Sequence, residues 1–404
     1  MAEWRHSTWG EEITLEYGKA LRNYSDAVGE YRVYGTNGPI GWTDTPLAQG
    51  PGVILGRKGA YRGVHYSPDP FFVIDTAYYV VPKTDLEMRW LYYAVIHYQL
   101  GQIDDGSPIP STTRAAVYPR DLAVPLRDEQ RAIAEVLGAL DDKIEQNRRT
   151  TRALERLARA IFRAWFVDFE PVKAKAGGAT TFPSMPQSMF DAVPTRFTES
   201  AIGPVPEGWE VKSLSQVATF LNGLALQKYA PRGDGQDLRV IKIAQLRKGS
   251  TDGADWANAD VPRDYIIDDN DLVFSWSGTL EVELWFGGRG ALNQHLFKVT
   301  STRIPKWFCL LWIRQHLPSF RAIAASKATT MGHIKRVHLD EARMAIPPRT
   351  FLGAADDVLD PLYVLYAQLQ VEARRLADMR DLLLPELLSG RTRVRGNEGS
   401  GHGE

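Results

Sequence analysis

Polar and aromatic side chains gather beside Gly-rich turns in both halves of this chain, and they are the groups best suited to binding chemistry. Arg and Lys can contact the edges of guanine, Asn and Gln those of adenine, and Ser and Thr commonly bind phosphate oxygens. In the first half the candidates are Tyr34, Thr36, Asn37, Arg57, Lys58, Tyr61, Arg62, Thr112, Thr113 and Arg114. In the second half they are Lys242, Gln245, Trp276, Ser277, Thr279, Asn293, Gln294, His295, Lys327, Thr329 and Thr330. The alternative is that each of these residues only stabilises the turn that contains it, by adopting a positive φ or by forming a local hydrogen bond.

Catalytic motifs are represented by one partial match. Phe286–Gly290 has the F-x-G-x-G form of the loop in adenosylmethionine-dependent methyltransferases, but a strand rather than a helix is expected after it. A Gly-rich hairpin turn is therefore the preferred interpretation. The sequence contains no N/D-P-P-Y/F motif, no phosphate-binding P-loop and no H-E-x-x-H pattern, and its 8 histidines show no paired metal-ligand spacing. We expect neither a catalytic site nor a metal site.

Two long helices must position these loops, because one heptad-like pattern occurs twice. Apolar or small residues recur at steps of four and three from Ile133 to Trp165 and again, 222 residues later, from Ala355 to Leu387. This spacing is typical of a helix seam packed against another helix, and Asn147 within it can fix the register. The predicted seam of the first helix contains Ile133, Leu137, Leu140, Ile144, Asn147, Leu154, Ile161 and Trp165. That of the second contains Leu359, Leu362, Tyr366, Leu369, Leu376, Leu383 and Leu387.

A second internal similarity marks the start of each half. At an offset of 205 residues, Trp4 aligns with Trp209 and Gly18 with Gly223. Each half thus consists of a globular unit followed by a long helix, which indicates a duplicated domain rather than a solenoid of short repeats. Both units combine strand-like and helix-like segments, and Phe71–Val81 is expected to form one bent strand or two short ones.

Three segments of the first unit have expected counterparts in the second. The pairs are Gly52–Gly59 with Asp271–Gly278, the aromatic run with Leu296–Val299, and the helical segment Met88–Leu100 with Trp307–Leu317. The shared order of these segments favours one common fold for both units.

The composition is that of an ordinary soluble globular protein. The 404 residues allow two or three domains, with 44% hydrophobic and 24% charged residues. A net charge of −1 gives no global support for nucleic-acid binding, although Lys143–Arg163 holds seven Lys or Arg against two Glu. The single cysteine, Cys309, lies in an apolar run and is expected to be buried and inert. No signal pattern opens the sequence and no apolar run reaches membrane-spanning length, so we expect a cytoplasmic protein.

In its arrangement the chain resembles the specificity subunits of type I restriction–modification systems. The stretches that carry the resemblance are Pro204–Trp209, Tyr34–Gly41, Val53–Gly59, Asn293–Val299 and the helices after Pro125 and Pro348. No single stretch makes the match. The order and the duplication of these stretches make it, and it covers nearly the whole chain. The first unit departs from the pattern, because it has only Glu3 and Trp4 where the second has a P-x-G-W opening.

The resemblance implies an α+β fold with two similar α/β target-recognition domains, separated by two long helices that form an antiparallel coiled coil. The predicted parts are target-recognition domain 1 (1–126), a central helix (127–170), a linker (171–204), target-recognition domain 2 (205–348), a C-terminal helix (349–390) and a disordered tail (391–404). Each domain would read one half of a split site in double-stranded DNA. The helices, each about 50 Å long, would set the unread spacer. That length is compatible with half-sites about one turn, roughly 34–36 Å, apart.

The resemblance also implies partners that carry the chemistry. Two methyltransferase subunits would dock on the helices, bind adenosylmethionine and methylate adenine, and a motor–nuclease subunit would join the full complex. The chain itself would then be non-catalytic and would bind no cofactor.

Two other functions are compatible with the same sequence features. A coiled-coil scaffold whose duplicated domains bind proteins would have no affinity for DNA and would tolerate changes at Lys58 or Gln245. A methyltransferase, suggested by Phe286–Gly290 alone, would require adenosylmethionine binding by the isolated chain.

Overall fold

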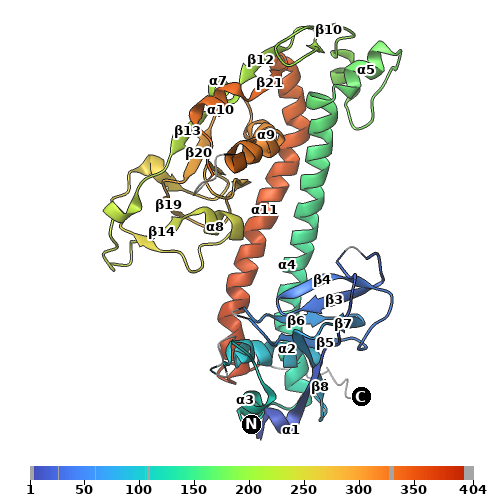
Figure 1. The fold of residues 1–404 in the computed structure, drawn as a ribbon, viewed down its shortest axis with the longest axis vertical. Helices are drawn as coiled ribbons and strands as arrows, with labels where there is room; N and C mark the ends of the chain where they lie inside the picture. The colour runs from blue at the N-terminus through green and yellow to red at the C-terminus, as the bar shows by residue number, and fades with distance from the viewer. Residues whose placement is uncertain are drawn as a thin grey trace, which may run out of the picture. The chain divides into compact units, whose positions relative to one another are not determined.

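The structure is a computed structural model that describes residues 4–25, 27–59, 61–104, 106, 110–326 and 332–394. The chain divides into two compact units (Figure 1). The first comprises Met1–Lys143 and Leu376–Glu404, and the second comprises Ile144–Arg375. Each unit therefore includes part of both long helices.

The first unit contains two small sheets and a two-stranded ribbon. Its strands are β1 (Arg5–Thr8), β2 (Ile13–Tyr17), β3 (Tyr31–Gly35), β4 (Gly38–Thr43), β5 (Gly52–Gly56), β6 (Val64–Ser67), β7 (Phe71–Val73), β8 (Ala77–Pro82) and β9 (Asp121–Val124). Its shorter helices are α1 (Trp9–Glu12), α2 (Met88–His97) and α3 (Arg114–Val117). One sheet is antiparallel with the order β2-β8-β5-β6, the other has the order β4-β3-β7 with β3 parallel to β7, and β1 pairs with β9.

Helix α2 closes the core of the first unit. Glu87 caps its start by accepting a hydrogen bond from the backbone N–H of Trp90 at 2.5 Å. Trp90 is fully buried in one cluster with Leu55 of β5. The apolar face of α2 thus holds the antiparallel sheet in place.

The aromatic run Phe71–Val81 forms two strands rather than one. A turn at residues 74–76 separates β7 from β8, and the two strands belong to different sheets. A single stretch of β-forming sequence therefore links the two sheets of the unit.

The second unit is built from the same kinds of element. Its strands are β10 (Phe197–Thr198), β11 (Val205–Pro206), β12 (Glu210–Ser213), β13 (Thr219–Asn222), β14 (Leu238–Ile241), β15 (Trp256–Ala257), β16 (Ile266–Ile267), β17 (Leu272–Ser275), β18 (Val282–Leu284), β19 (Gly290–Leu292), β20 (Leu296–Thr300) and β21 (Arg343–Ile346). Its shorter helices are α5 (Glu170–Ala176), α6 (Gln187–Asp191), α7 (Leu214–Val217), α8 (Ile243–Lys248), α9 (Lys306–Ser326) and α10 (Arg336–Glu341).

The two units share one topology, and the predicted fold class is confirmed. The order β2-β8-β5-β6 recurs as β13-β20-β17-β18, with every pair antiparallel. The order β4-β3-β7 recurs as β15-β14-β19 with the same parallel pair, and β16 adds one further strand. The ribbon β1-β9 recurs as β12-β21.

Gly18 and Gly223, aligned by the sequence offset, lie at the same point of this topology. A Cβ atom on Gly18 would lie 2.1 Å from the carbonyl oxygen of Ile74, and one on Gly223 would lie 2.2 Å from that of Asn293. Each glycine lets its backbone approach the residue that follows β7 or β19 more closely than any side chain would permit.

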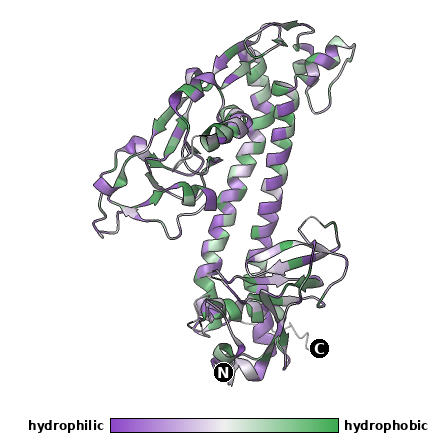
Figure 2. Ribbon diagram, viewed as in Figure 1, coloured by the Kyte–Doolittle hydropathy of each residue, from purple (hydrophilic) through white to green (hydrophobic). Residues whose placement is uncertain are grey.

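The long helices are α4 (Arg127–Phe162), which continues into a π-helical segment at Arg163–Val167, and α11 (Arg349–Leu388). Every residue of the two predicted seams is buried or half-buried. Hydrophilic and hydrophobic residues alternate along both helices (Figure 2). The large apolar side chains of α11 that are exposed are those of Val364, Leu365, Met379 and Leu382.

Two polar pairs show that the helices run antiparallel. In the second unit, Nδ2 of Asn147 donates to Oε2 of Glu372 at 2.8 Å. In the first unit, Nη1 of Arg380 donates to Oδ1 of Asp141 at 2.7 Å. Residue numbers rise along α4 as they fall along α11. The seam asparagine, which is 1% exposed, thus has a specific partner across the helix pair.

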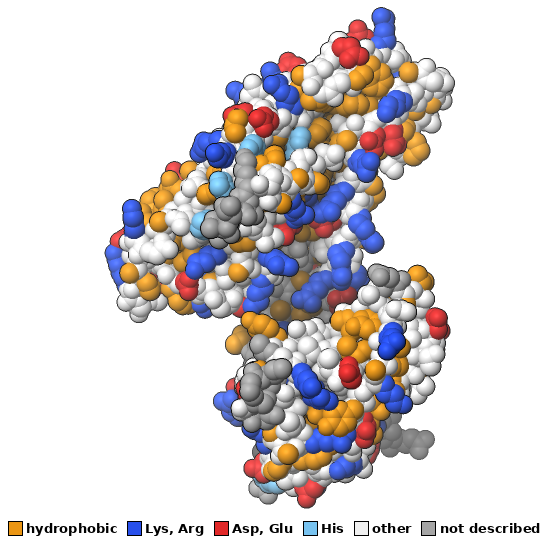
Figure 3. Space-filling model, in the orientation of Figure 1, with side chains coloured by type: hydrophobic (Ala, Val, Ile, Leu, Met, Phe, Trp, Pro, Cys, Tyr) orange, Lys and Arg blue, Asp and Glu red, His pale blue; other side chains and the backbone are white. Residues whose placement is uncertain are grey.

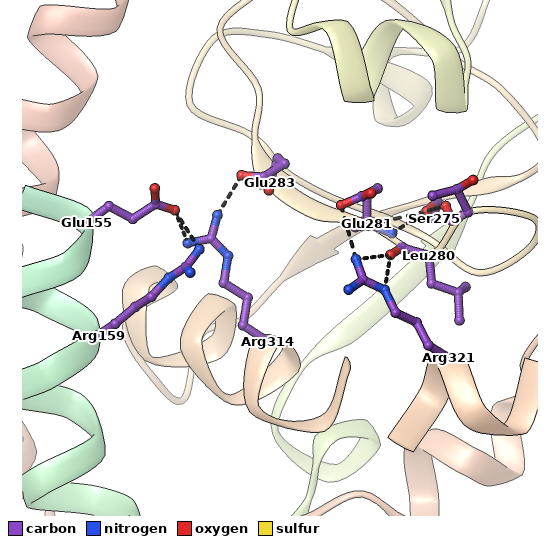
Figure 4. A network of polar contacts seen from close by, with 9 residues as sticks. Glu155, Arg159, Ser275, Leu280, Glu281, Glu283, Arg314 and Arg321 are labelled. Carbon is purple, nitrogen blue, oxygen red and sulfur yellow. Dashed lines mark hydrogen bonds and ion pairs between the residues drawn. The ribbon is translucent and has the colours of Figure 1, made fainter. Parts of the chain in front are cut away.

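Arg314 of α9 ties the globular part of the second unit to α4 (Figure 4). Its Nη2 donates to Glu283 of β18 at 2.5 Å, and its Nη1 donates to Glu155 of α4. Glu155 also accepts a hydrogen bond from Arg159, at 2.9 Å. The Arg314 side chain is 11% exposed, so this ion pair lies largely out of water.

Segment 171–204 is more structured than a linker. It holds most of α5 and all of α6, and it buries Met189 and Phe190 in the core of the second unit. Lys175 Nζ donates to the carbonyl oxygens of Phe190, Asp191 and Val193. A few anchors at irregular spacing fix this segment, which is why its sequence shows no periodicity.

The predicted tail begins with ordered contacts. Arg391 pairs with Glu386 at 3.3 Å, and Val394 packs against the core of the first unit. Residues 395–404 lie outside the described residues.

Candidate nucleic-acid interface

The loop after β5 brings together several predicted residues of the first unit. Oγ1 of Thr36 donates to the carbonyl oxygen of Lys58 at 2.8 Å, and the carbonyl oxygen of Arg57 accepts from the backbone N–H of Thr112 at 2.9 Å. Lys58 also forms a β-bridge with Ser111. The Lys58 side chain is exposed, so this frame presents a cation to solvent.

Two arginines flank an exposed tyrosine beside this loop. The guanidinium carbon of Arg57 lies 5.0 Å and that of Arg114 lies 4.5 Å from the ring centre of Tyr17. Nε of Arg114 donates to the carbonyl oxygen of Leu15 at 2.7 Å, and its Nη2 lies 3.7 Å from Glu16. Tyr17, which is 47% exposed, was not among the predicted residues, although it directly precedes the aligned Gly18.

Other predicted residues of the first unit hold the domain together. Tyr34 is buried edge-to-face against Phe71, at 6.1 Å between ring centres. Oγ1 of Thr112 is fully buried and donates to the carbonyl oxygens of Leu100 and Ile103. These two side chains are taken up by the core and are not available to a ligand.

Arg62 and Thr113 also bond to their own unit. Arg62 donates to the carbonyl oxygens of Gly59, Gly101 and Ile103, and Thr113 caps α3 by accepting from the backbone N–H of Ala116. For these residues the turn interpretation describes the structure better. Asn37 and Tyr61 remain exposed.

In the second unit, Trp276 occupies the centre of the corresponding loop. Its Nε1 donates to Oδ1 of Asn222 at 2.7 Å and to the carbonyl oxygen of Gln294 at 3.2 Å. Its ring centre lies 5.9 Å from that of His295. Oγ of Ser277 lies 3.0 Å from Nδ1 of the same histidine. These contacts make a compact aromatic and polar cluster in which Trp276, Gln294 and His295 are half-exposed.

The remaining candidates of the second unit have mixed environments. Lys242 is exposed and pairs with Asp255, whereas Gln245 is buried and caps α8 by accepting from the backbone N–H of Lys242 at 3.3 Å. Asn293 is buried, and its Oδ1 accepts from the backbone N–H of His295 at 3.3 Å. Thr279 is exposed. Lys327, Thr329 and Thr330 lie outside the described residues.

Equivalent positions in the two units carry different chemistry. Strand register aligns Tyr17 with Asn222, because they pair with Tyr78 and Phe297 respectively, and the loop positions of Arg57 and Trp276 then correspond. The first unit places a guanidinium over a phenol ring there, and the second places an indole N–H against an amide. One scaffold thus presents two chemically distinct surfaces.

Other site chemistry is sparse in the described residues. The loop Phe286–Gly290 connects β18 of one sheet to β19 of another, so it is a crossover and not the predicted hairpin turn, and it leads into a strand. Within the described ranges, no group of three or more His, Cys, Asp or Glu side chains is placed to hold a metal ion. Cys309 is buried as predicted, and burial raises the pKa of its thiol to about 12.

Charged side chains of both signs lie on the face of the molecule seen in Figure 3. Among the helices that the structure describes, none combines the length and apolar character that a bilayer span requires.

Two α+β domains of one topology, with long antiparallel helices, define the architectural class, and the comparisons agree with it. No protein-family model matches the chain. The chain is 24% identical over 405 residues to the type I restriction enzyme MjaIX specificity subunit of Methanocaldococcus jannaschii, a match that covers 96% of this chain and 88% of that protein. It is also 24% identical over 325 residues to the HindI specificity subunit of Haemophilus influenzae, covering 70% of this chain and 71% of that protein.

A solved structure shares the fold. The crystal structure of the type I restriction–modification S subunit from M. genitalium superposes with a TM-score of 0.59 at 14% identity, covering 95% of this chain and 96% of that one. The chain therefore has the fold of a type I specificity subunit, and the resemblance predicted from the sequence is confirmed by these relatives.

Proposed function

We propose that this chain is the DNA-recognition subunit of a type I restriction–modification complex. Each target-recognition domain reads one half of a bipartite site, and the paired helices set the length of the unread spacer. Methyltransferase subunits dock on the helices and bind adenosylmethionine. A motor–nuclease subunit completes the complex, and the chain itself performs no catalysis.

The observation that carries this proposal is one scaffold with two different surfaces. Two domains that recognise unlike sequences need the same frame but different side chains where bases are contacted. Arg57 over Tyr17 and Trp276 against Asn222 meet that requirement at equivalent positions. The names of the relatives, specificity subunits of type I restriction enzymes, support the same assignment.

Mapping of adenine methylation by single-molecule sequencing tests the proposal. Cells that express this chain together with its methyltransferase partner are compared with cells that lack only this chain. Loss of one split motif, two short defined ends around an unread spacer, is the expected result, and it also supplies both half-sites. An unchanged pattern despite expression of the partner would favour the protein-binding scaffold.

A further inference from the structure

A stacked arginine–tryptophan pair occurs at the same place in both units. Arg32 of β3 faces Trp42 of β4 across the antiparallel ribbon, with its guanidinium carbon 3.8 Å from the ring centre. Arg239 of β14 faces Trp256 of β15 in the same way at 3.6 Å. β3 and β14 are equivalent, since each has an antiparallel partner on one side and a parallel partner, β7 or β19, on the other.

Both pairs lie on strands that lead directly into the candidate interface. β3 ends at Gly35, immediately before Thr36, which bonds to the loop that holds Lys58. β14 ends immediately before Lys242, and Trp256 lines a surface hollow together with Lys242. The pairs are therefore close to the residues that differ between the units, yet are themselves the same in both.

The charge of each pair is available to a ligand. Arg32 is exposed, Trp256 is 46% exposed, and Arg239 is half-buried with one N–H donated to the carbonyl oxygen of Ala254 at 3.1 Å. Across the described ranges, neither guanidinium forms an ion pair with a carboxylate. Stacking on an indole fixes the plane of the guanidinium and leaves its edge free to meet an anion.

We propose that the two Arg–Trp pairs are sequence-independent contacts to DNA phosphates, one in each half-site. Phosphates are alike in both half-sites whereas bases are not, so a contact kept in both units is suited to the backbone. A planar guanidinium can bind phosphate oxygens with two parallel hydrogen bonds. This inference rests on the function proposed above, and the competing explanation is that the pairs only stabilise the sheet as cross-strand contacts.

The salt dependence of DNA binding separates these explanations. The full-length chain, assembled with its modification subunits, is titrated with a duplex carrying the mapped motif and with an unrelated duplex of equal length. The slope of log K against log salt is negative. Arg32→Gln and Arg239→Gln should each reduce its magnitude by about 0.9, because each variant loses one phosphate contact. Each should weaken binding to both duplexes by roughly tenfold. Arg131→Gln, which removes an exposed arginine already paired with Asp128, serves as the control and should leave the slope unchanged.

A second variant tests the role of the stack. Trp256→Leu retains the charge of Arg239 but frees its side chain, so affinity should fall while the salt slope stays that of the wild type. A lower melting temperature with unchanged slopes in both arginine variants would assign the pairs to sheet packing and overturn the inference. If the wild-type assembly bound neither duplex, both the inference about the Arg–Trp pairs and the proposed function would be wrong.

Discussion

At the scale of single residues, the loop positions of Arg57 and Trp276 offer different groups to a ligand. Arg57 lies over Tyr17 and has donors suited to guanine, whereas the Trp276 N–H is already taken by Asn222 and a carbonyl oxygen. Trp276 therefore contributes ring surface and shape rather than a free donor. The two domains should consequently depend on different kinds of contact.

Arg57→Ala should weaken recognition of one half-site only. The loss of a base-contacting arginine is expected to cost about 1–3 kcal/mol of binding free energy and to relax discrimination at the contacted bases. Competition binding with duplexes substituted in one half-site or the other measures this effect. Trp276→Phe is the reciprocal variant and should affect only the other half-site. Equal loss at both half-sites in either variant would contradict independent reading by the two domains.

Glu12 makes the first unit sensitive to acid. Burial by itself would raise the pKa of the Glu12 carboxyl, but hydrogen bonds from Arg5, Ser7 and Thr84 outweigh it and lower that pKa from 4.5 to about 2. A depressed pKa means that the ionised carboxylate stabilises the fold above pH 4.5, and that this stabilisation is lost as the pH falls toward 2.

Glu12→Gln should lower the free energy of unfolding at pH 7 by about 3 kcal/mol. Because the wild type loses the same contribution in acid, the difference between variant and wild type should narrow between pH 4.5 and pH 2. Urea unfolding of both proteins across this range provides the measurement. A constant difference at all pH values would show that packing, not charge, explains the effect.

At the scale of elements, a largely buried cation, Arg314, joins α9 to α4 beside the aromatic contacts of Phe162 with Phe308 and Trp312. Arg314 lies between Glu155 of α4 and Glu283 of β18, while Arg321 of the same helix contacts Leu280 and Glu281 (Figure 4). Burial raises the pKa of Glu283, an effect that Arg314 opposes. Without that cation, the two half-buried carboxylates, whose side chains are 23% and 37% exposed, would remain close together.

Arg314→Met should therefore destabilise the second unit by about 2–3 kcal/mol, because it leaves two half-buried carboxylates without the cation that they share. Arg159→Gln is a matched control: it removes an arginine bound to the same Glu155 but 52% exposed, and it should cost less than about 1 kcal/mol. Chemical denaturation of the two variants gives the comparison. Similar losses of unfolding free energy in both variants would show that apolar contacts, rather than Arg314, stabilise this junction.

At the scale of the whole molecule, both units share the same two helices, and the proposed spacer length follows from them. The seam keeps one phase through α4 and α11, with Asn147 and Glu372 paired across it. Removal of one heptad from α4 and of the facing heptad from α11 preserves that phase.

This paired deletion shortens each helix by about 10 Å, so the preferred spacer should shorten by about three base pairs. Methylation mapping of the variant measures the spacer directly. Deletion from one helix alone should instead disrupt the seam and abolish modification. An unchanged spacer after the paired deletion would refute the role of the helices as a ruler.

The sequence by itself determined the duplication, the helix pair and the fold class. The two seams, Ile133–Trp165 and Ala355–Leu387, and the match of Gly18 with Gly223 are periodic or local signals of the sequence. The relatives and the shared fold agree with the resemblance that the sequence carries.

Only the tertiary structure decided which polar residues serve the fold and which face solvent. Thr112 and Lys58 belong to the same class of turn residue in the sequence, yet one hydroxyl is buried on two carbonyl oxygens and the other side chain is exposed. The offset of 205 residues does not align the Arg–Trp pairs with each other. The reason is that segments of different length separate Arg32 from Trp42 and Arg239 from Trp256. Burial and cross-strand pairing depend on contacts between segments that are distant in sequence. Local patterns in the sequence do not specify those contacts.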